Sequence, residues 1–488
     1  MDPSINARAD PVQPLKVCLL THQMKSIESY NYQGHKPLER KDIRPNYKST
    51  QLESGLQILT ETANFPSAIH MGMFRLENQL KIGILIECGA RDEDVHTSGV
   101  LAALKSIQYK TAKHSNETMN YGRIQLSGGD IVMDYDMERI YIKGSCVEHN
   151  ASDQLKMMID MAFEPKTKGA CDVARVLYQR NHEQIQSMVS QDPSILANDE
   201  LMKTAYGEQT LGMPLQGLYQ NAHNINAETI NGFIDEQISP ERVLIVANGV
   251  ENHEDFVDLV RLHLGGNGPI QKSPKPKIPS KYQGGFYTHK INDSETIKIN
   301  LAFETVPWHS TEMPAFFVMN TLIGNAQSFS SGGPGKGMYC RAITNMMQKY
   351  EMIIEAGAIN NHYADSGLFG LSITGNSIQY ETLLRVICEE MQNLSKPIQD
   401  IELLRAKNIL KMNVLMAMER KEERLEEIAR NYMTYDDLTF MQYLPNIDKV
   451  TSDDVNKAAL RIMKTTPTLV AFGGYADKIT PRLLSRHF

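Results

Sequence analysis

The sequence predicts an α+β protein in which one mixed α/β domain occurs twice, with a linker between the copies. Residues 79–107, "QLKIGILIECGARDEDVHTSGVLAALKSI", are typical of an alternating strand, a polar loop and a helix. Residues 296–324, "TIKINLAFETVPWHSTEMPAFFVMNTLIG", repeat that order. Residues 225–249 and 450–474 also match, because each predicts a helix, a Ser-Pro or Thr-Pro break, and a strand ending in glycine. The matching points are about 215–230 residues apart, and a duplicated domain is the simplest account of this spacing.

The length of the chain leaves room for this duplication. Its 488 residues can hold roughly two to four domains of about 150 residues each. Residues 1–50 lack an apolar period and are expected to form an N-terminal arm. Residues 264–288 are rich in Pro, Gly and Lys, which favours a linker. The two domains are therefore expected at 51–263 and 289–488.

Charge and cysteine content narrow the class of protein. A net charge of −8 and a pI of about 6.0 argue against a nucleic-acid-binding surface, which would need a basic patch. No apolar run in the sequence approaches the ~18 residues of a membrane-spanning helix. The six cysteines show no metal-binding spacing, so we expect them to be buried, reduced thiols.

Local patterns predict several further elements. Residues 123–146 are expected to form a β-hairpin or meander, with the alternation broken at Gly128 and Gly129. Residues 151–165 and 381–397 are expected to be helices that stop near a proline.

The stretch 400–433 predicts a long helical region with a highly charged end. We interpret the charged end, residues 419–430, as a solvated helix face. Glu426 and Arg430 would form an i,i+4 ion pair on that face.

The stretch "SFSSGGPGKGMY", residues 328–339, combines four glycines with a lysine, which suggests a phosphate-binding loop. A P-loop would need glycine at Ser330 and a hydroxyl at Gly337, so the motif fails at both ends. The dinucleotide pattern G-x-G-x-x-G fails as well. The residues alone leave two interpretations open: a flexible turn, or a loop whose backbone is exposed to an extended partner.

At this point the residues show a family resemblance. The run "SFSSGGPGKGMYCR" after "NTLIG" closely resembles the glycine-rich loop of mitochondrial processing peptidase alpha subunits. These subunits belong to the pitrilysin-type metallopeptidases and are related to the core subunits of respiratory complex III. Residues 359–375, "INNHYADSGLFGLSITG", resemble the Tyr-x-Asp-x-Gly-Leu segment of the same family. The resemblance covers roughly residues 50–480 and implies two pitrilysin-like domains.

The resemblance also locates a zinc motif that this chain lacks. Catalytic members carry H-x-x-E-H on the helix after the first strand, where the two histidines bind zinc and the glutamate activates water. When "GAR" at 89–91 and the following glycine are aligned, these positions fall on Ala102, Lys105 and Ser106. The third zinc ligand would fall on Glu183, and His182 beside it would face another side of the helix. We therefore expect no catalytic residue, no bound metal and no cofactor.

The resemblance implies a subunit that recognises a substrate and leaves hydrolysis to its partner. The partner would be a beta-type processing peptidase subunit, or core subunit 1, in a heterodimer, and the ligands would be presequence peptides. Further complex III subunits would be partners in the mitochondrial matrix, at the inner membrane. A purely structural core subunit of complex III is the alternative. The residues expected to bind substrate are those of the glycine-rich loop: Ser330, Ser331, Gly332, Gly333, Pro334, Gly335, Lys336 and Gly337.

Overall fold

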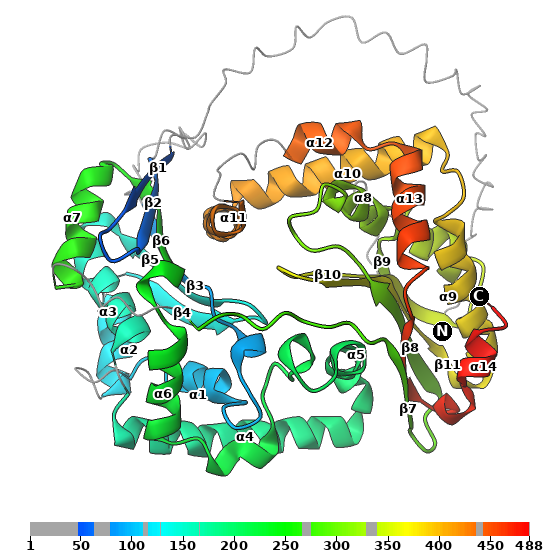
Figure 1. The fold of residues 1–488 in the computed structure, drawn as a ribbon, viewed down its shortest axis with the longest axis horizontal. Helices are drawn as coiled ribbons and strands as arrows, with labels where there is room; N and C mark the ends of the chain where they lie inside the picture. Colours follow the sequence, from blue (N-terminus) through cyan, green and yellow to red (C-terminus); the bar gives the residue numbers. More distant parts are fainter. Residues whose placement is uncertain are drawn as a thin grey trace, which may run out of the picture. The chain divides into compact units, whose positions relative to one another are not determined.

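The computed structural model contains two six-stranded sheets that share a five-stranded topology and carry the sixth strand at opposite edges (Figure 1). It describes residues 47–62, 79–110, 116–126, 128–164, 166–265, 275–327, 339–435 and 443–487. The first sheet contains, in spatial order, β1 (Tyr47–Gln51), β2 (Gln57–Thr62), β6 (Val243–Val250), β3 (Gln79–Ile86), β5 (Ile140–Val147) and β4 (Asp130–Tyr135). The second contains β7 (Gly285–Lys290), β12 (Thr468–Gly473), β8 (Thr296–Glu304), β11 (Gly367–Asn376), β10 (Ile353–His362) and β9 (Asn325–Gln327).

The five strands β2, β6, β3, β5 and β4 run in the same pattern of directions as β7, β12, β8, β11 and β10. In the first sheet β2 pairs with β6 in parallel, and in the second β7 pairs with β12 in parallel. All other neighbours in both sheets are antiparallel. The central strands β3 and β8 are the two alternating strands from which the duplication was predicted. The predicted α+β fold with two homologous domains is thereby confirmed.

One face of each sheet is covered mainly by helices from its own half of the chain. We call the residues from 47 to 263 the first half and those from 285 to 487 the second half. The helices of the first half are α1 (Val100–Ser106), α2 (Glu117–Leu126), α3 (Ala151–Phe163), α4 (Lys168–Gln191), α5 (Ala197–Tyr206), α6 (Ala227–Gln237) and α7 (His253–His263). Those of the second half are α8 (Met313–Ile323), α9 (Tyr380–Asn393), α10 (Asp400–Glu419), α11 (Lys421–Tyr435), α12 (Tyr443–Lys449), α13 (Ser452–Ile462) and α14 (Pro481–Leu484).

The opposite face of each sheet is covered by a helix from the other half (Figure 1). Helix α5 of the first half packs Leu201 and Tyr206 against Val470 and Phe472 of the second sheet. Helix α11 of the second half buries an apolar stripe on the first sheet, which consists of Leu425, Ile428 and Ala429. Because each half covers the other's sheet, the halves interlock.

The close contact of α11 with β3 depends on a glycine. A Cβ atom on Gly83 would lie 2.6 Å from Cδ2 of Leu425, closer than two carbon atoms can approach. The missing side chain therefore leaves the space into which Leu425 packs.

The predicted helical region 400–433 consists of two helices; its charged end is solvated at residues 419–423, but the ion pair predicted there between Glu426 and Arg430 does not form. Helix α10 ends at Glu419, and α11 begins at Lys421. Glu426 pairs with Lys143 of β5, whereas Arg430 pairs with Glu427, so the expected i,i+4 pair does not form. The reason lies in the tertiary structure. Helix α11 packs on the first sheet, so charged residues of that sheet compete with neighbours on the helix as ion-pair partners.

Two further ion pairs join α11 to the first sheet. Lys81 of β3 lies 2.5 Å from Glu422, and Arg424 forms an ion pair with the buried Glu61 of β2. Part of the charge of α11 therefore contributes to the contact between the halves.

The predicted hairpin exists but begins later than expected. Strands β4 and β5 pair in antiparallel register, and residues 123–126 belong to helix α2. The glycines at 128 and 129 follow the end of that helix, and Gly128 adopts φ +67°. Alternation in the sequence could not distinguish a short amphipathic helix from a strand at this point.

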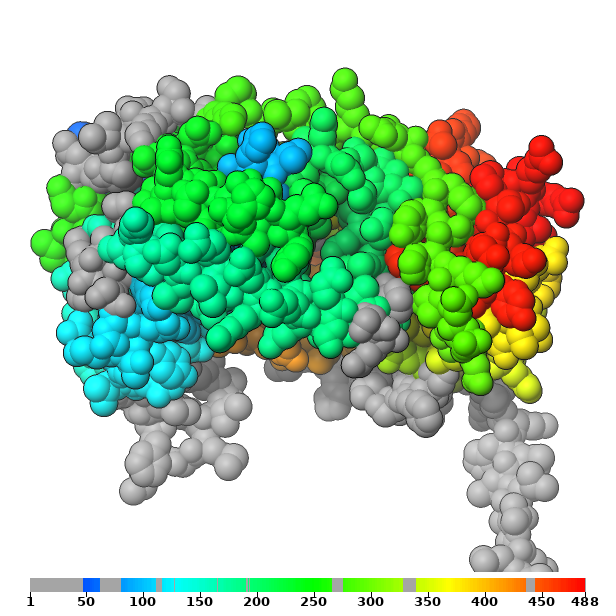
Figure 2. Space-filling view, turned by 90° about the horizontal axis from the view of Figure 1, so that it is seen from below, coloured from blue at the N-terminus to red at the C-terminus, as the bar shows by residue number. Residues whose placement is uncertain are grey.

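The segment that connects the two halves comes from the middle of the sequence. Figure 2 shows one face, on which green segments from the middle of the chain lie between the cyan part of the first half and the red C-terminal residues. Strand β1 begins at Tyr47 and β7 at Gly285, inside the stretches expected to be arm and linker. The domain boundaries drawn from the sequence stay predictions.

Two further expectations concern cysteines and membrane helices. Each cysteine in the described residues is buried and outside any disulfide: Cys88, Cys146, Cys171, Cys340 and Cys388. Within the described ranges, no helix combines the length and hydropathy that crossing a bilayer requires.

Candidate functional site

Helix α1 carries the three residues that align with the zinc motif, and none has metal-binding chemistry. Ala102 packs its methyl group against the core of the first half. Lys105 extends outward, and its Nζ lies 2.9 Å from Oδ1 of Asp134 on β4. Ser106 donates its hydroxyl to the carbonyl of Ala103 in the same helix, at 2.6 Å. A methyl, an ammonium and an internally bonded hydroxyl provide no zinc ligand.

Helix α4 turns a different residue toward α1 than the alignment suggested. Glu183 is exposed, whereas its neighbour His182 is buried with its ring 4.5 Å from that of Tyr178. Nε2 of His182 lies 3.1 Å from the carbonyl oxygen of Gln216, and burial lowers the pKa of this imidazole. A Cβ on Gly99 would lie 2.3 Å from the Tyr178 hydroxyl, so Tyr178 abuts the start of α1. Throughout the part of the chain that the structure describes, no three His, Cys, Asp or Glu side chains are grouped to hold a metal.

A buried carboxyl group holds the N-terminus of α1. Glu93 accepts hydrogen bonds from the backbone N–H groups of Gly99 and Leu101, both at 2.8 Å. Burial raises the pKa of Glu93 to about 8, although the two N–H groups act in the opposite direction. Helix α1 is therefore fixed in place by the structure of the first half.

The outer edge of β4, next to α1, is closed by side chains. The backbone N–H of Met133 donates to Oε1 of Gln108 at 2.6 Å, and Tyr109 donates its hydroxyl to the carbonyl of Ile131 at 2.9 Å. Edge strands with unpaired backbone groups attract further strands, and side chains that bind those groups prevent this. The first sheet thus has a sealed edge beside the zinc-motif positions.

The substrate-binding residues predicted from the sequence lie outside the residues that the structure describes. These are Ser330, Ser331, Gly332, Gly333, Pro334, Gly335, Lys336 and Gly337. The segments before and after them are described: β9 ends at Gln327, and the chain resumes at Tyr339.

The segment after the loop is anchored by a buried cation. Nε of Arg341 lies 2.7 Å from Oε1 of Glu402 on α10, and its Nη1 lies 3.5 Å from Oε1 of Glu390 on α9. The guanidinium of Arg405 lies over the ring of Tyr339, 5.0 Å from its centroid. The C-terminal end of the loop stretch is therefore held against α9 and α10.

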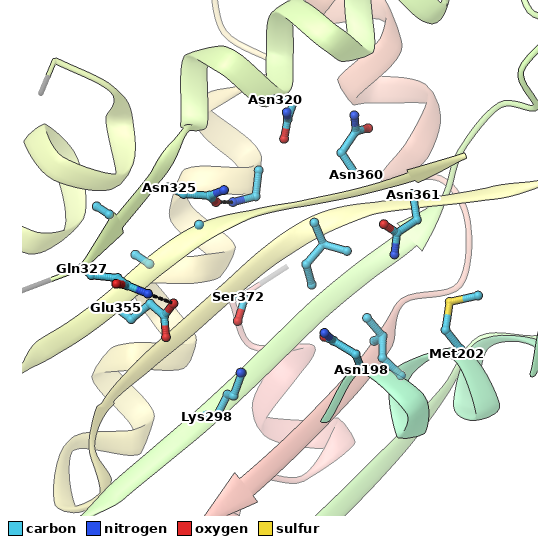
Figure 3. A pocket seen from close by; sticks show the side chains of 16 residues that line it. Asn198, Met202, Lys298, Asn320, Asn325, Gln327, Glu355, Asn360, Asn361 and Ser372 are labelled. Carbon is cyan, nitrogen blue, oxygen red and sulfur yellow. Dashed lines mark hydrogen bonds between the residues drawn. The ribbon is translucent and has the colours of Figure 1, made fainter. Parts of the chain in front are cut away.

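A polar groove of about 680 Å³ lies on the second sheet, bordered by β9 and β10 and by α5 on the other side (Figure 3). Gln327 donates to Glu355 at 2.9 Å, and the Asn325 side-chain oxygen accepts the N–H of Ala358 at 3.1 Å. Side-chain amides both donate and accept, which suits a polypeptide backbone as ligand. The polar side chains of the lining are Asn198, Lys298, Asn320, Asn325, Gln327, Glu355, Asn360, Asn361 and Ser372.

A second hollow of about 530 Å³ adjoins this groove. The two share Lys298 and Glu355 in their linings, and the second adds the carboxylates of Asp192 and Asp293. Three acids against one lysine give this end of the groove a negative charge. A cationic ligand would be attracted to it.

The "GAR" segment used to align the zinc motif and the segment 359–375 that resembles the family meet in the structure. Nη1 of Arg91 lies 2.7 Å from Glu138, and its Nη2 lies 2.7 Å from Asp365 and 3.0 Å from the Ser280 hydroxyl. The Arg91 side chain is only 3% exposed. Burial raises the pKa of Asp365, but the hydrogen bonds from Arg91 and from the Ser280 backbone, together with the charge of Arg91, lower this pKa overall. One guanidinium thus joins the first half, the connecting segment and the second half.

Sequence reasoning missed this cluster and the groove for different reasons. Arg91 and Asp365 each belong to a recognisable segment, but nothing in either segment indicates that they pair. The amides of the groove come from both halves and from four elements, α5, α8, β9 and β10. The only local signal was the asparagine pair in "INNH", residues 359–362.

Comparison with known proteins relates the chain to the family that the sequence suggested. Residues 224–410 match a family described as the peptidase M16 inactive domain. The mitochondrial-processing peptidase subunit alpha of Caenorhabditis elegans is 24% identical over 94% of this chain and 89% of its own length. Relatives of that name occur in several further organisms, including Homo sapiens and Schizosaccharomyces pombe.

Solved structures show the same fold. A chain of complex III from Candida albicans aligns with a TM-score of 0.71 and 17% identity, covering 90% of this chain and 99% of the other. A protease from Helicobacter pylori aligns with a TM-score of 0.75 and 16% identity, covering 88% and 99%. The chain therefore has the pitrilysin-like M16 fold and is related to processing peptidase alpha subunits.

Proposed function

We propose that this relative of the processing peptidase alpha subunits is itself a non-catalytic alpha-type subunit, which binds presequences for a zinc-bearing beta-type subunit. The observation that carries the proposal is the amide-lined groove that borders β9, the strand immediately before the glycine-rich stretch. The positions of the zinc motif hold Ala102, Lys105 and Ser106, so the hydrolytic water would be activated by the partner.

The groove fits the proposed ligand in two respects. Its amides can bond the backbone of an extended peptide whatever the sequence of that peptide. Its acidic end, with Asp192 and Asp293, would attract the basic residues of a presequence. The complex would act in the mitochondrial matrix, at the inner membrane, and the chain would also serve there as a core subunit of complex III.

Deleting Gly332–Gly337 from this chain, in complex with its beta-type partner, tests the proposal. We expect the KM for a presequence peptide to rise at least about tenfold, because binding contacts are lost while the partner's catalytic site is untouched. Unchanged amounts of purified complex and an unchanged thermal unfolding temperature would show that assembly is intact. An unchanged KM and kcat would contradict a role of the loop in substrate binding.

The groove can be tested separately from the loop. Asp293→Asn combined with Glu355→Gln should weaken binding of a basic presequence peptide, and the loss should shrink as salt rises. Asp172→Asn, at an exposed acid on α4, is the matched control and should leave binding unchanged. Equal effects of both changes would show that only net charge matters.

A structural role in complex III is the second candidate function. It is favoured by the alignment with a chain of complex III from Candida albicans over 99% of that chain. Native purification distinguishes the two candidates: cytochromes would copurify in the structural case with no cleavage of presequence peptides by the same fraction. Cleavage by that fraction would support the processing role.

A further inference from the structure

A further pocket, of about 440 Å³ and separate from the groove on the second sheet, lies where α10 ends and α11 begins. One wall is apolar and includes the only tryptophan of the chain. The other wall is polar and belongs to α11. The apolar residues are Trp308, Phe317, Leu410, Val414, Ala417, Met418 and Ile447, and the charged ones are Glu423, Glu426, Glu427 and Arg430.

The residues of both walls recur at helical spacing. On α10 the lining residues are three or four positions apart, from Leu410 through Val414 to Ala417 and Met418. On α11 the same spacing runs from Glu423 through Glu426 and Glu427 to Arg430. Residues three and four apart share one face of a helix. The pocket is therefore bounded by a face of α10 that is apolar apart from Asn413 and by a polar face of α11 that carries three glutamates.

Glu423 and Glu426 retain the capacity to bind a further donor, whereas both oxygens of Glu427 already accept hydrogen bonds, from Arg430 and Asn431. Arg420 bonds to one oxygen of Glu423, and Lys143 to one oxygen of Glu426. A carboxylate accepts at both oxygens, so a second donor can bind to each. Arg430 is held by Glu427 and lies over the ring of Trp308, 5.4 Å from its centroid, so part of its charge is already engaged.

The exposure of these three glutamates determines how much their charge can contribute to the affinity for a ligand. The side chains of Glu423, Glu426 and Glu427 are 47%, 37% and 28% exposed. Ion pairs at such solvated positions contribute little to affinity. The apolar wall would supply most of the binding free energy, and the acids would select the charge and orientation of the ligand.

We propose that this pocket binds a cationic amphipathic helix, with its apolar face on α10 and Trp308 and its basic face on α11. An apolar wall opposite a wall with glutamates fits a ligand that is apolar on one side and basic on the other, as an amphipathic helix in a groove is. The glutamates disfavour an acyl chain that carries an anionic headgroup. This inference rests on the proposed function, because it assigns to the same class of basic peptide a second binding site on this chain.

The fluorescence of Trp308 provides a direct readout, since the sequence contains one tryptophan. The probe is a tryptophan-free helical peptide of Leu, Ala and Arg, with Leu on one face and Arg on the other. Two controls have the same length: a scrambled peptide of equal composition, and a peptide with Glu in place of Arg. We expect a saturable change in Trp308 emission with the first peptide and no saturable change with either control.

Matched variants on α10 test whether the pocket itself binds. Val414→Gln should weaken binding roughly tenfold, because burying an apolar group of that size is worth about one tenfold step in affinity. Leu415→Gln, one residue later, changes a side chain that is 43% exposed and outside the lining, and it should leave binding unchanged. Glu423→Lys, at an exposed position that cannot disturb the core, should weaken binding and reduce its salt dependence.

Three results would overturn the inference: equal binding of the scrambled peptide, equal binding of the Glu peptide, or no effect of Val414→Gln and Glu423→Lys. The proposed function can fail independently. If deleting Gly332–Gly337 raises the KM for presequence peptides while Trp308 does not respond, presequence recognition stands and this second site is refuted. If Trp308 responds as expected while the deletion has no effect on cleavage, the site stands and the role of the loop is refuted.

Discussion

Strands β4 and β10 occupy equivalent places in the two sheets, but β4 is an edge strand closed by side chains, whereas β10 pairs on its outer side with the short strand β9. Gln108 and Tyr109, which follow α1, bond the outward backbone groups of β4. The ten-residue β10 is bordered only by the three-residue β9, and the polar groove opens there. Five strands of each sheet share one topology, so the difference between the two edges comes from the side chains that close β4 and from the short additional strand β9 beside β10.

The largest effect on stability is expected from breaking the ion pairs of Arg91, which join the two halves that contain β4 and β10. Arg91→Met removes the cation between Glu138 and Asp365. Removing one partner of a buried ion pair leaves uncompensated charge and should destabilise the protein by about 3–5 kcal/mol. Urea unfolding would show this as a lower midpoint.

A matched change at an exposed pair provides the control. Lys105→Met breaks the ion pair between Lys105 and Asp134, in which both side chains are about half exposed. It should lower the free energy of unfolding by less than about 1 kcal/mol. Equal urea midpoints for the Arg91 and Lys105 variants would contradict a joining role for Arg91.

An intermediate effect on stability is expected from a change of pH. His362 in the second half and Glu93 in the first half should respond in opposite directions. His362 at the end of β10 is buried, which lowers its pKa from 6.5 to about 4. The unfolded chain then binds a proton before the folded one, so stability falls as pH drops from 6.5 to about 4, by roughly 3 kcal/mol. Glu93 has its pKa raised to about 8, so its contribution falls as pH rises from 4.5 to about 8.

Single substitutions separate the two contributions. His362→Gln should flatten the acid side of the stability profile, and Glu93→Gln should remove the decline toward pH 8. Urea midpoints measured from pH 4 to 8 give both slopes. A profile that neither substitution changes would refute the assignment of these groups.

The smallest effect is expected from opening the sealed edge. Gln108→Leu leaves the N–H of Met133 without its acceptor, which should cost about 1–3 kcal/mol. Hydrogen exchange at the Met133 amide should accelerate, because its hydrogen bond is gone. Gln125→Leu on the exposed face of α2 is the matched control and should change neither stability nor that exchange rate. Unaltered exchange in the Gln108 variant would show that the edge is protected in another way.

Local patterns predicted the elements well where a single segment contained the whole signal. The paired strand–loop–helix units appear as β3 with α1 and as β8 with α8. The prediction failed where a partner lay far away in the sequence. Glu426 pairs with Lys143 across 283 residues, which an i,i+4 argument cannot anticipate. The residues aligned with the zinc motif lie on α1, and on α4 His182 is buried whereas Glu183 is exposed, so the two face different sides as predicted.

By itself, the sequence determined the duplicated α+β architecture and the absence of H-x-x-E-H, because both are properties of residue types at fixed spacing. Only the tertiary structure decided which edge is sealed, where Arg91 finds Asp365, and that α5 and α11 each cover the other half's sheet. The sealed edge depends on contacts 22 and 25 positions apart, and the pairing of Arg91 with Asp365 on a contact 274 positions apart. The pairing of Arg91 arises from packing two similar domains against each other, and no local pattern records any of these contacts.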